Sequence, residues 1–454
     1  MKKLTYLIPA LLLLGGVSAY AQTVNDADRH EIVEKLGNKL VEVYPFPEIS
    51  KQYKDALTKN EAAGRYNNLS EDELASRLTE DLSKAHKDVH LRIMRNVDTY
   101  KNLTEPREGG GGGRNSEAES QRKSNYGFKS VQIDGATSTA YVDIPGPFYG
   151  SQEAFETAAA AMNMSANSKN IILDIRHNPG GTGQMGRFLA SYFYFPGQEQ
   201  FYLNGFYKDR KMDEQEWTYS YVPGKRLTNT SVYILVGPGT ASASEGFAYA
   251  MQKLRRATIV GETTAGAGIA GTFVALKNNL VVFTPFKMVV APNSNVGWEG
   301  TGVIPDVVSG KEDALAVARR LILQNMASNG SDSTQKEAAQ WILDDGVFAT
   351  KKATDLKSKY GELVGKYTNN VTVTYAKGNL TWNRNEPRKP AESFIIKELK
   401  PDVLVITGLN SNIGPNSSRA YINRDAQGKF ISITRKTMMN NGSIYVGPQP
   451  LTKL

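Results

Sequence analysis

The feature that most constrains the fold is an alternation of short apolar segments with helical patterns between residues 128 and 326. The apolar segments have the length of strands and lie at residues 139–144, 170–175, 231–236, 258–260, 272–276 and 280–284. Apolar residues recur at helical spacing at residues 152–162, 183–194, 242–254 and 312–324. This alternation is typical of an α/β domain, a layered core with a largely parallel sheet. Ligands bind such sheets at the carboxyl ends of the strands.

The chain has 454 residues, which is too long for one ordinary domain, so we expect further domains before and after this core. Apolar residues at helical spacing predict an N-terminal helical domain over residues 22–95. Residues 96–127 hold five consecutive glycines and are predicted to be a glycine-rich linker or loop, since no Gly-Lys-Ser/Thr follows to make a phosphate-binding loop. Residues 327–454 predict a C-terminal domain with a small all-β module, because strand-like segments alternate there with turn signals.

The first 21 residues predict a signal peptide. Lys2 and Lys3 precede an apolar stretch over residues 4–14, and Ala19-Tyr20-Ala21 matches a cleavage site before Gln22. We therefore expect export, to the periplasm or the extracellular space. No other segment is long and apolar enough to span a bilayer, so we expect no membrane span in the mature chain.

Composition excludes several classes of function. The chain has no cysteine, which excludes disulfides, thiol nucleophiles and thiolate metal sites. The net charge is +8, but the basic residues are scattered along the sequence without a dense tract, so nucleic acid is not an expected partner.

The segment Thr240-Ala241-Ser242-Ala243-Ser244-Glu245 carries the strongest chemical signal. It joins the apolar strand at residues 232–236 to a helical pattern, so its hydroxyl groups lie at the positive end of a helix dipole. An acyl-transfer nucleophile and its oxyanion need that environment. The alternative is a simple N-cap, for which serine and threonine are common.

Two glycine-containing loops offer further groups. Gly180 and Gly181 follow the strand at residues 170–175, and paired glycines allow close approach of a ligand to the backbone; an ordinary tight turn is the alternative. Glu299 lies among glycines beside Trp298, where a carboxylate can orient a histidine or remain a solvated loop acid.

A serine nucleophile needs a base, and the chain has four histidines, His30, His86, His90 and His177. His90 begins an extended segment after the helical domain. His86 and His90 are four residues apart and could pair as metal ligands on a helix, but no third ligand is near in sequence, so no metal is predicted.

Taken in this order, these segments resemble the C-terminal processing (tail-specific) peptidase family, which includes the tricorn core and the repeats of interphotoreceptor retinoid-binding protein. The resemblance covers roughly residues 26–326 and rests on residues 88–91, 173–181, 240–245, 261–268 and 298–306. It implies a ClpP/crotonase-like core and a serine peptidase that needs no cofactor. The family's nucleophile lies three residues before the motif glutamate, which gives Ser242 rather than Ser244.

The resemblance also implies the roles of the other residues. His90 would be the general base, Glu299 would orient His90, and the backbone of Ala243 with Gly180 or Gly181 would form the oxyanion hole. Many members use a serine–lysine dyad, but the corresponding segment here is Gly266-Ala267-Gly268, without a lysine. Residues 91–127 are too short for the PDZ module that many members carry, because domains usually need about 50 or more residues.

The expected substrate is a peptide or protein. A second hypothesis is a non-catalytic carrier of lipids or other apolar ligands on the same fold, to which the aromatic segment Phe188, Tyr192, Phe193 and Tyr194 would contribute. A third hypothesis gives the C-terminal β module a partner or glycan to bind.

Overall fold

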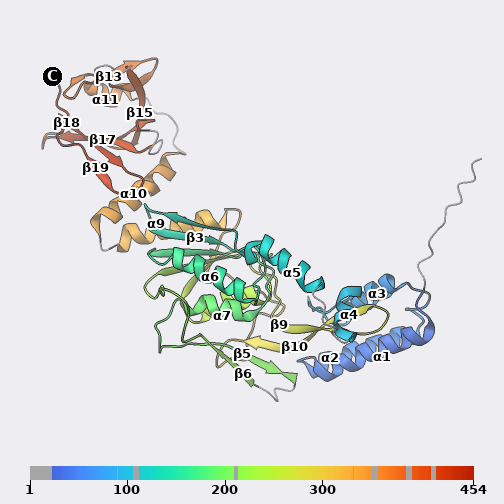
Figure 1. Ribbon diagram of the computed structural model, residues 1–454. Coiled ribbons are helices and arrows are strands. Elements are labelled where there is room, and N and C mark those ends of the chain that lie inside the picture. Colours follow the sequence, from blue (N-terminus) through green and yellow to red (C-terminus); the bar gives the residue numbers. More distant parts are fainter. Residues whose placement is uncertain are drawn as a thin grey trace, which may run out of the picture. The chain divides into compact units, whose positions relative to one another are not determined.

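The computed structural model describes residues 23–88, 90–105, 112–208, 213–330, 332–349, 356–384, 391–410 and 416–454 (Figure 1). The predicted signal peptide lies outside these residues. The chain forms two compact units. The first holds Met1–Gly110, Phe206–Asp213 and Ile269–Met288, and the second holds Gly111–Gly205, Glu214–Gly268 and Val289–Leu454.

Three helices make up most of the first unit: α1 (Asp26–Val43), α2 (Pro47–Ala62) and α3 (Glu71–Ala85). The Ser70 hydroxyl accepts a hydrogen bond from the Glu73 amide while the Glu73 carboxylate accepts one from the Ser70 amide, so a reciprocal cap fixes the start of α3. The buried leucines of the three helices form one core, as predicted for a helical domain.

The first unit also contains strands from the middle of the chain. Strand β1 (Arg92–Arg95) pairs antiparallel with β10 (Leu280–Val290), which pairs on its other side with β9 (Ile269–Ala275). We predicted β9 and β10 as strands, but within the parallel α/β core. The tight turn at Asn278 and Asn279, both at positive φ, instead joins them as a hairpin, and Leu280 and Val282 join the core of the helices.

Two helices lie in the range predicted as a linker. Helix α4 (Val97–Thr104) is capped by the Asn96 side chain, which accepts from the Thr99 amide. Helix α5 (Gly112–Lys123) carries a Lys123–Glu119 ion pair one turn apart and leads into the short 3-10 helix η1 (Asn125–Gly127). Residues 106–111, which include most of the glycine run, are outside the described part.

The second unit is built on a six-stranded sheet in the order β11-β8-β7-β4-β3-β2. Strand β2 (Ser130–Asp134) is antiparallel to β3 (Thr139–Asp143). All other pairs are parallel, through β4 (Asn170–Asp174), β7 (Ser231–Val236), β8 (Ala257–Gly261) and β11 (Val307–Val308). The predicted α/β core is confirmed.

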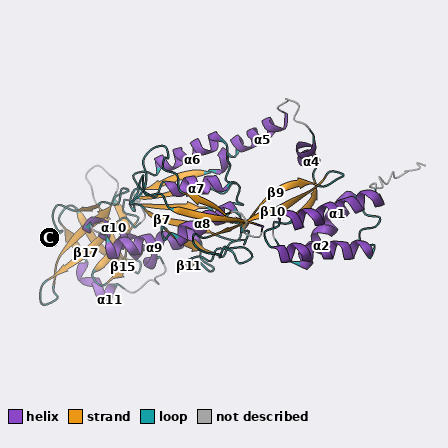
Figure 2. Cartoon of the chain, turned by 90° about the horizontal axis from the view of Figure 1, so that it is seen from below, coloured by secondary structure: helices purple, strands orange, loops and turns teal. Residues whose placement is uncertain are grey.

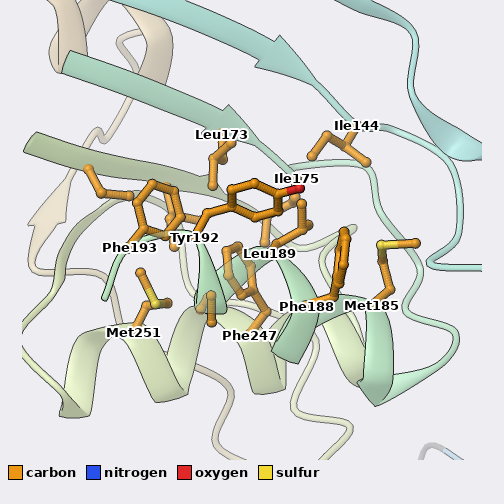
Figure 3. Packing of buried hydrophobic residues seen from close by; sticks show 14 of the residues in the cluster. Ile144, Leu173, Ile175, Met185, Phe188, Leu189, Tyr192, Phe193, Phe247 and Met251 are labelled. Atoms are coloured by element: carbon orange, nitrogen blue, oxygen red, sulfur yellow. The ribbon is translucent and has the colours of Figure 1, made fainter. Parts of the chain in front are cut away.

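Helices cover both faces of this sheet (Figure 2). Ile171 and Leu173 of β4 point to a core shared with α6 (Gln152–Met164), α7 (Gly183–Ser191) and α8 (Ala243–Lys253), which Figure 3 shows in part. Ile172 points to the opposite core, which is shared with α9 (Ala314–Asn329). Burial on both faces explains why these strands are continuous apolar runs. Strands β5 (Phe201–Tyr207) and β6 (Asp213–Trp217), which pair with each other in a different sheet, were not predicted.

The C-terminal part begins with helices α10 (Ser333–Phe348) and α11 (Lys357–Tyr360) and the 3-10 helix η3 (Gly361–Leu363). An eight-stranded antiparallel sheet follows, in which each strand pairs with the next. Its strands are β12 (Gly365–Tyr367), β13 (Val371–Ala376), β14 (Asn379–Arg384), β15 (Glu392–Lys400), β16 (Val403–Thr407), β17 (Ser418–Arg424), β18 (Phe430–Met438) and β19 (Ile444–Val446).

The last residues of the chain close this sheet into a barrel. Leu451 exchanges backbone hydrogen bonds of 2.8 and 3.0 Å with Ile433 of β18. On the other side the Thr452 carbonyl accepts from Thr368, and the Leu454 amide donates to Lys366 of β12. The predicted all-β module is thus an up-and-down barrel. Among the described residues, no helix combines the length and apolar character needed to cross a membrane.

Candidate active site

Ser242 occupies a strained turn between β7 and α8. Its backbone has φ 55° and ψ −119°, in the positive-φ region that residues other than glycine rarely adopt. The serine and threonine N-caps at Ser70, Ser151 and Thr182 all have the usual extended backbone. Ser242 therefore differs from an ordinary cap. A sharp strand-to-helix turn that carries a strained serine is a known arrangement for exposing a nucleophile.

The carboxylate of Glu245 holds this turn in place. Glu245 is fully buried, and its Oε2 accepts hydrogen bonds from the amides of Ser242 (2.7 Å) and Ala267 (2.8 Å). Its Oε1 accepts from the Gly266 amide (2.7 Å) and the Thr264 hydroxyl (2.5 Å). Four donors compensate the buried charge, so the carboxylate ties the serine to the loop at residues 264–267.

The two serines of the motif have different surroundings. Ser244 is fully buried, and its hydroxyl lies 2.7 Å from the Ala241 carbonyl and 2.8 Å from the Asn178 carbonyl. Ser242 is only half-buried. The Ser244 hydroxyl is therefore part of the packing of the turn, whereas Ser242 stays partly accessible; Ser242 as the nucleophile remains a prediction from the motif spacing.

The glycine loop after β4 packs directly against Ser242. A Cβ at Gly180 would lie 2.6 Å from the Ala241 carbonyl oxygen and 2.8 Å from the Ser242 Cβ, so only glycine fits there. The Gly180 amide donates to the Asn178 side chain at 3.0 Å, whereas Gly181 is exposed to solvent. Of the two glycines, Gly180 therefore packs against Ser242 and Ala243, and Gly181 is the more accessible.

Glu299 lies on the loop after β10. Its Oε2 accepts a hydrogen bond from the Gly268 amide at 2.6 Å, and a Cβ at Gly268 would come within 2.6 Å of the Glu299 amide nitrogen. The neighbouring Trp298 is buried against Tyr249 of α8, with ring centroids 5.1 Å apart. Ala267, which replaces the lysine of the serine–lysine dyad, is buried. The segment at residues 264–268 is thus bonded to Glu299 directly and to Ser242 through the Glu245 carboxylate.

His90 belongs to the first unit, between α3 and β1. Asp88 accepts hydrogen bonds from the His90 amide (2.8 Å) and from the Tyr44 hydroxyl (2.8 Å), and its Oδ1 is 3.9 Å from the His90 Nδ1. The imidazole stacks on Phe283 of β10 at 5.9 Å. Burial, and then the negative charge of Asp88, raise the pKa of Tyr44 far above its ordinary value, so this phenol remains a donor to the carboxylate.

The remaining histidines lie elsewhere. Helix α3 ends at Ala85, so His86 and His90 both follow the helix and do not share a helical face. His30 is exposed with its Nδ1 3.3 Å from Glu61, and His177 is exposed on the loop after β4.

Within the second unit the structure brings together Ser242, Ala243 and Gly180, and Gly181 follows directly in the chain. Glu299 is bonded to Gly268, which follows the loop that Glu245 holds. A contact between His90 and Ser242 stays a prediction. Sequence reasoning missed the supporting residues Glu245, Thr264, Asn178 and Asp88. The spacing of Ser242 and Glu245 was a signal for the first of these, because a glutamate three residues after a helix start can bond back to its backbone.

Comparison with known proteins identifies the family. The model of peptidase family S41 matches residues 138–309. A second model, the N-terminal domain of Peptidase_S41 in eukaryotic IRBP, matches residues 26–124. The first match covers the core that contains Ser242 and Glu299, and the second covers the part that contains His90.

Among curated proteins, a probable CtpA-like serine protease of Staphylococcus epidermidis is 32% identical over 140 residues, which are 31% of this chain and 27% of that protein. A carboxyl-terminal-processing protease of Synechocystis is 28% identical over 208 residues, 45% of this chain and 44% of that protein. The matches thus span less than half the length of these relatives.

Among solved structures, a putative peptidase from Parabacteroides merdae is 17% identical with a TM-score of 0.48, over 65% of this chain and 97% of that one. The photosystem II D1 C-terminal processing protease is 16% identical with a TM-score of 0.43, over 68% and 99% of the two chains. The chain thus contains a peptidase family S41 core at residues 138–309, preceded at residues 26–124 by a match to the N-terminal domain model of that family.

Proposed function

We propose that the protein is an exported serine endopeptidase with Ser242 as its nucleophile. One observation carries this proposal: Ser242 is held at positive φ at the start of α8, its amide fixed by Glu245 and its Cβ packed against a glycine that nothing larger can replace. Such strain costs about 1–3 kcal/mol, and function is a common reason for a protein to retain it. Export rests on the leader-like first 21 residues.

In this mechanism His90 takes the proton of the Ser242 hydroxyl as the oxygen attacks a peptide carbonyl. Glu299 orients the imidazole and stabilises its protonated form, by the logic of a catalytic triad. The amides of Ala243 and Gly181 stabilise the oxyanion, and loss of one such donor typically lowers turnover by about 10²–10³. His90 then donates the proton to the leaving amine as the C–N bond breaks, and a water molecule whose proton passes to the same imidazole releases the acyl group from Ser242 as a carboxylic acid. Because Ala267 stands at the lysine position, the base comes from His90 rather than from a serine–lysine dyad.

The test is covalent labelling of the full chain with a fluorophosphonate. We expect one label on Ser242, with labelling and peptide cleavage both lost in Ser242→Ala and strongly reduced in His90→Ala and Glu299→Gln. Ser151→Ala is a matched control, because it removes a helix-capping serine from the same unit. Undiminished labelling and cleavage in Ser242→Ala would refute the assignment.

The carrier hypothesis finds less support in the packing. Phe188, Tyr192 and Phe193 are buried in the core between the sheet and helices α7 and α8 (Figure 3). Phe188 packs edge-on against Tyr192 at 5.5 Å. These side chains fill the core and do not form the wall of a binding site.

A further inference from the structure

Asn178, in the loop after β4, has a side chain whose two polar atoms are both bonded to backbone groups. The residue is fully buried. Its Nδ2 donates to the Ile144 carbonyl at 3.1 Å, and its Oδ1 accepts from the Gly180 amide at 3.0 Å. Ile144 is itself completely buried in the core that Figure 3 shows, so these bonds are shielded from solvent. Because one end of the side-chain amide meets an acceptor and the other a donor, the group has a single favoured orientation.

The backbone of Asn178 connects the same loop to the turn that carries Ser242. The Asn178 carbonyl accepts from the Ala241 amide at 3.1 Å, and the Ser244 hydroxyl lies 2.8 Å from that carbonyl. Asn178 is therefore bonded to Gly180 through its side chain and to the residues around Ser242 through its carbonyl. The bonds of this one residue thus link the glycine loop to the proposed nucleophile.

The peptide group between Gly180 and Gly181 is held by Phe148. The Gly180 carbonyl accepts from the Phe148 amide at 2.6 Å, and the Phe148 carbonyl accepts from the Thr182 amide at 2.8 Å. In a trans peptide the C=O and N–H bonds point in opposite directions, so the Gly181 amide points away from Phe148. The preceding peptide group is fixed by the bond from the Gly180 amide to Asn178. Two consecutive peptide groups of the loop therefore have defined directions before any substrate binds.

The side chain of Asn178 contributes geometry more than stability. Its hydrogen bonds replace bonds to water in the unfolded chain, so their net contribution to folding is small. A buried amide with its partners in place instead makes its surroundings rigid. An oxyanion donor needs this rigidity, because it stabilises the developing negative charge only when it is fixed in the right place in advance.

We propose that Asn178 is a positioning residue of the oxyanion hole: by holding the Gly180 amide, it sets the peptide group from which Gly181 donates to the carbonyl oxygen of the substrate. This inference rests on the proposed function of Ser242. Asn178 does not touch the substrate in this arrangement, and its effect is transmitted by the glycine backbone. Loss of its side chain should therefore slow the covalent step without weakening the binding that precedes it.

The test resolves the reaction of the full chain with an alkyl fluorophosphonate into the binding constant KI and the rate constant of the covalent step, kinact. In that step the Ser242 oxygen bonds to phosphorus, fluoride leaves, and the hydroxyl proton passes to the base. The phosphonyl oxygen takes the place of the substrate's carbonyl oxygen, so kinact responds to the oxyanion donors. We expect Asn178→Ala to lower kinact about 10²-fold, the typical cost of a small misplacement, with KI unchanged.

Two further variants separate positioning from packing. Asn178→Leu fills the same space with a side chain of the same branching but makes neither hydrogen bond, so it should react as slowly as Asn178→Ala, and it replaces that variant if the alanine chain does not fold. Asn170→Ala is the matched control, because Asn170 is also buried and its Nδ2 donates to the Thr137 carbonyl at 3.1 Å, at the opposite end of β4. It should lower the melting temperature and leave kinact unchanged.

A parent-like kinact in Asn178→Ala, recovery of kinact in Asn178→Leu, or an equal fall in Asn170→Ala would overturn the proposal. A rise in KI without a change in kinact would overturn it too, because it would assign Asn178 to substrate binding. A parent chain in which Ser242 takes no label would instead refute the proposed function, and the positioning role with it.

Discussion

The amide of Ser242 donates a 2.7 Å hydrogen bond to Oε2 of Glu245, and that one carboxylate also holds the segment that leads to Gly268 and Glu299. A buried acid that does no chemistry in the proposed mechanism thus fixes the backbone of the proposed nucleophile. All four hydrogen bonds end on the same two oxygens of Glu245, so a change of this one side chain would weaken them together.

Glu245→Gln should reduce both stability and labelling. Glutamine replaces one of the two carboxylate oxygens by an NH2 group, which cannot accept hydrogen bonds from the donors on that side. Each buried N–H or O–H group left unpaired costs about 1–3 kcal/mol. Urea unfolding and the rate of fluorophosphonate labelling of the folded fraction measure the two effects. Glu262→Gln, an exposed acid near the same segment, is the control, and an equal effect there would contradict this account.

Gly180→Ala should abolish labelling and lower stability by about 1–3 kcal/mol, because alanine is strained at φ 103° and its Cβ would collide with Ala241 and Ser242. Gly183→Ala, three residues later, would place its Cβ within 4 Å of none of the described residues and should be neutral or slightly stabilising in the first turn of α7. Thermal unfolding of the pair is the measurement. Comparable stability of the two variants would mean that the loop does not pack as described.

Ser242→Gly should be more stable than the parent by about 1 kcal/mol, while Ser242→Ala should not, because only glycine relieves the strain at positive φ. Both variants should be inactive. Urea unfolding of parent and variants at neutral pH tests this separation of stability from activity. Equal stabilities of the glycine and alanine variants would show that Ser242 stores no strain.

Asp81 should make the stability of the first unit depend on pH at acid values. Burial would raise its pKa, but hydrogen bonds and the charge of Arg65 outweigh burial and hold the pKa below its ordinary value of 3.8. The ionised form therefore stabilises the fold above about pH 4, and this contribution is lost as the pH falls through the lowered pKa. The parent should melt higher than Asp81→Asn at pH 7, and this difference in melting temperature should shrink as the pH is lowered to 2. A difference that stays constant from pH 7 to pH 2 would contradict a stabilising role of ionised Asp81.

Patterns within a few residues predicted the regular part of the fold well. The strands at residues 170–175 and 231–236 are buried on both faces and therefore appear as continuous apolar runs, and the helix at residues 242–254 follows from its spacing. Pairings between distant segments were not predictable in this way. Nothing near Arg92 indicates that it pairs with Phe283, so the placement of β9 and β10 in the first unit was missed.

The site shows the same limit. Motif order and spacing selected Ser242, Gly180 and Glu299, but the sign of φ at Ser242 and the four bonds to Glu245 depend on how the loop at residues 264–267 packs. The linker prediction gave too much weight to the glycines and too little to the helix-forming residues after them.

The closure of the barrel by Leu451–Leu454 has a consequence for the order of its assembly. The segment at residues 451–454 that joins β12 to β18 lies more than 80 residues after β12 in the sequence, so closing the ring costs more loop entropy than forming a hairpin and is slower. Until those residues pair, β12 and β18 have unpaired edges, so the open barrel is a folding stage at which the chain is exposed to edge-to-edge aggregation.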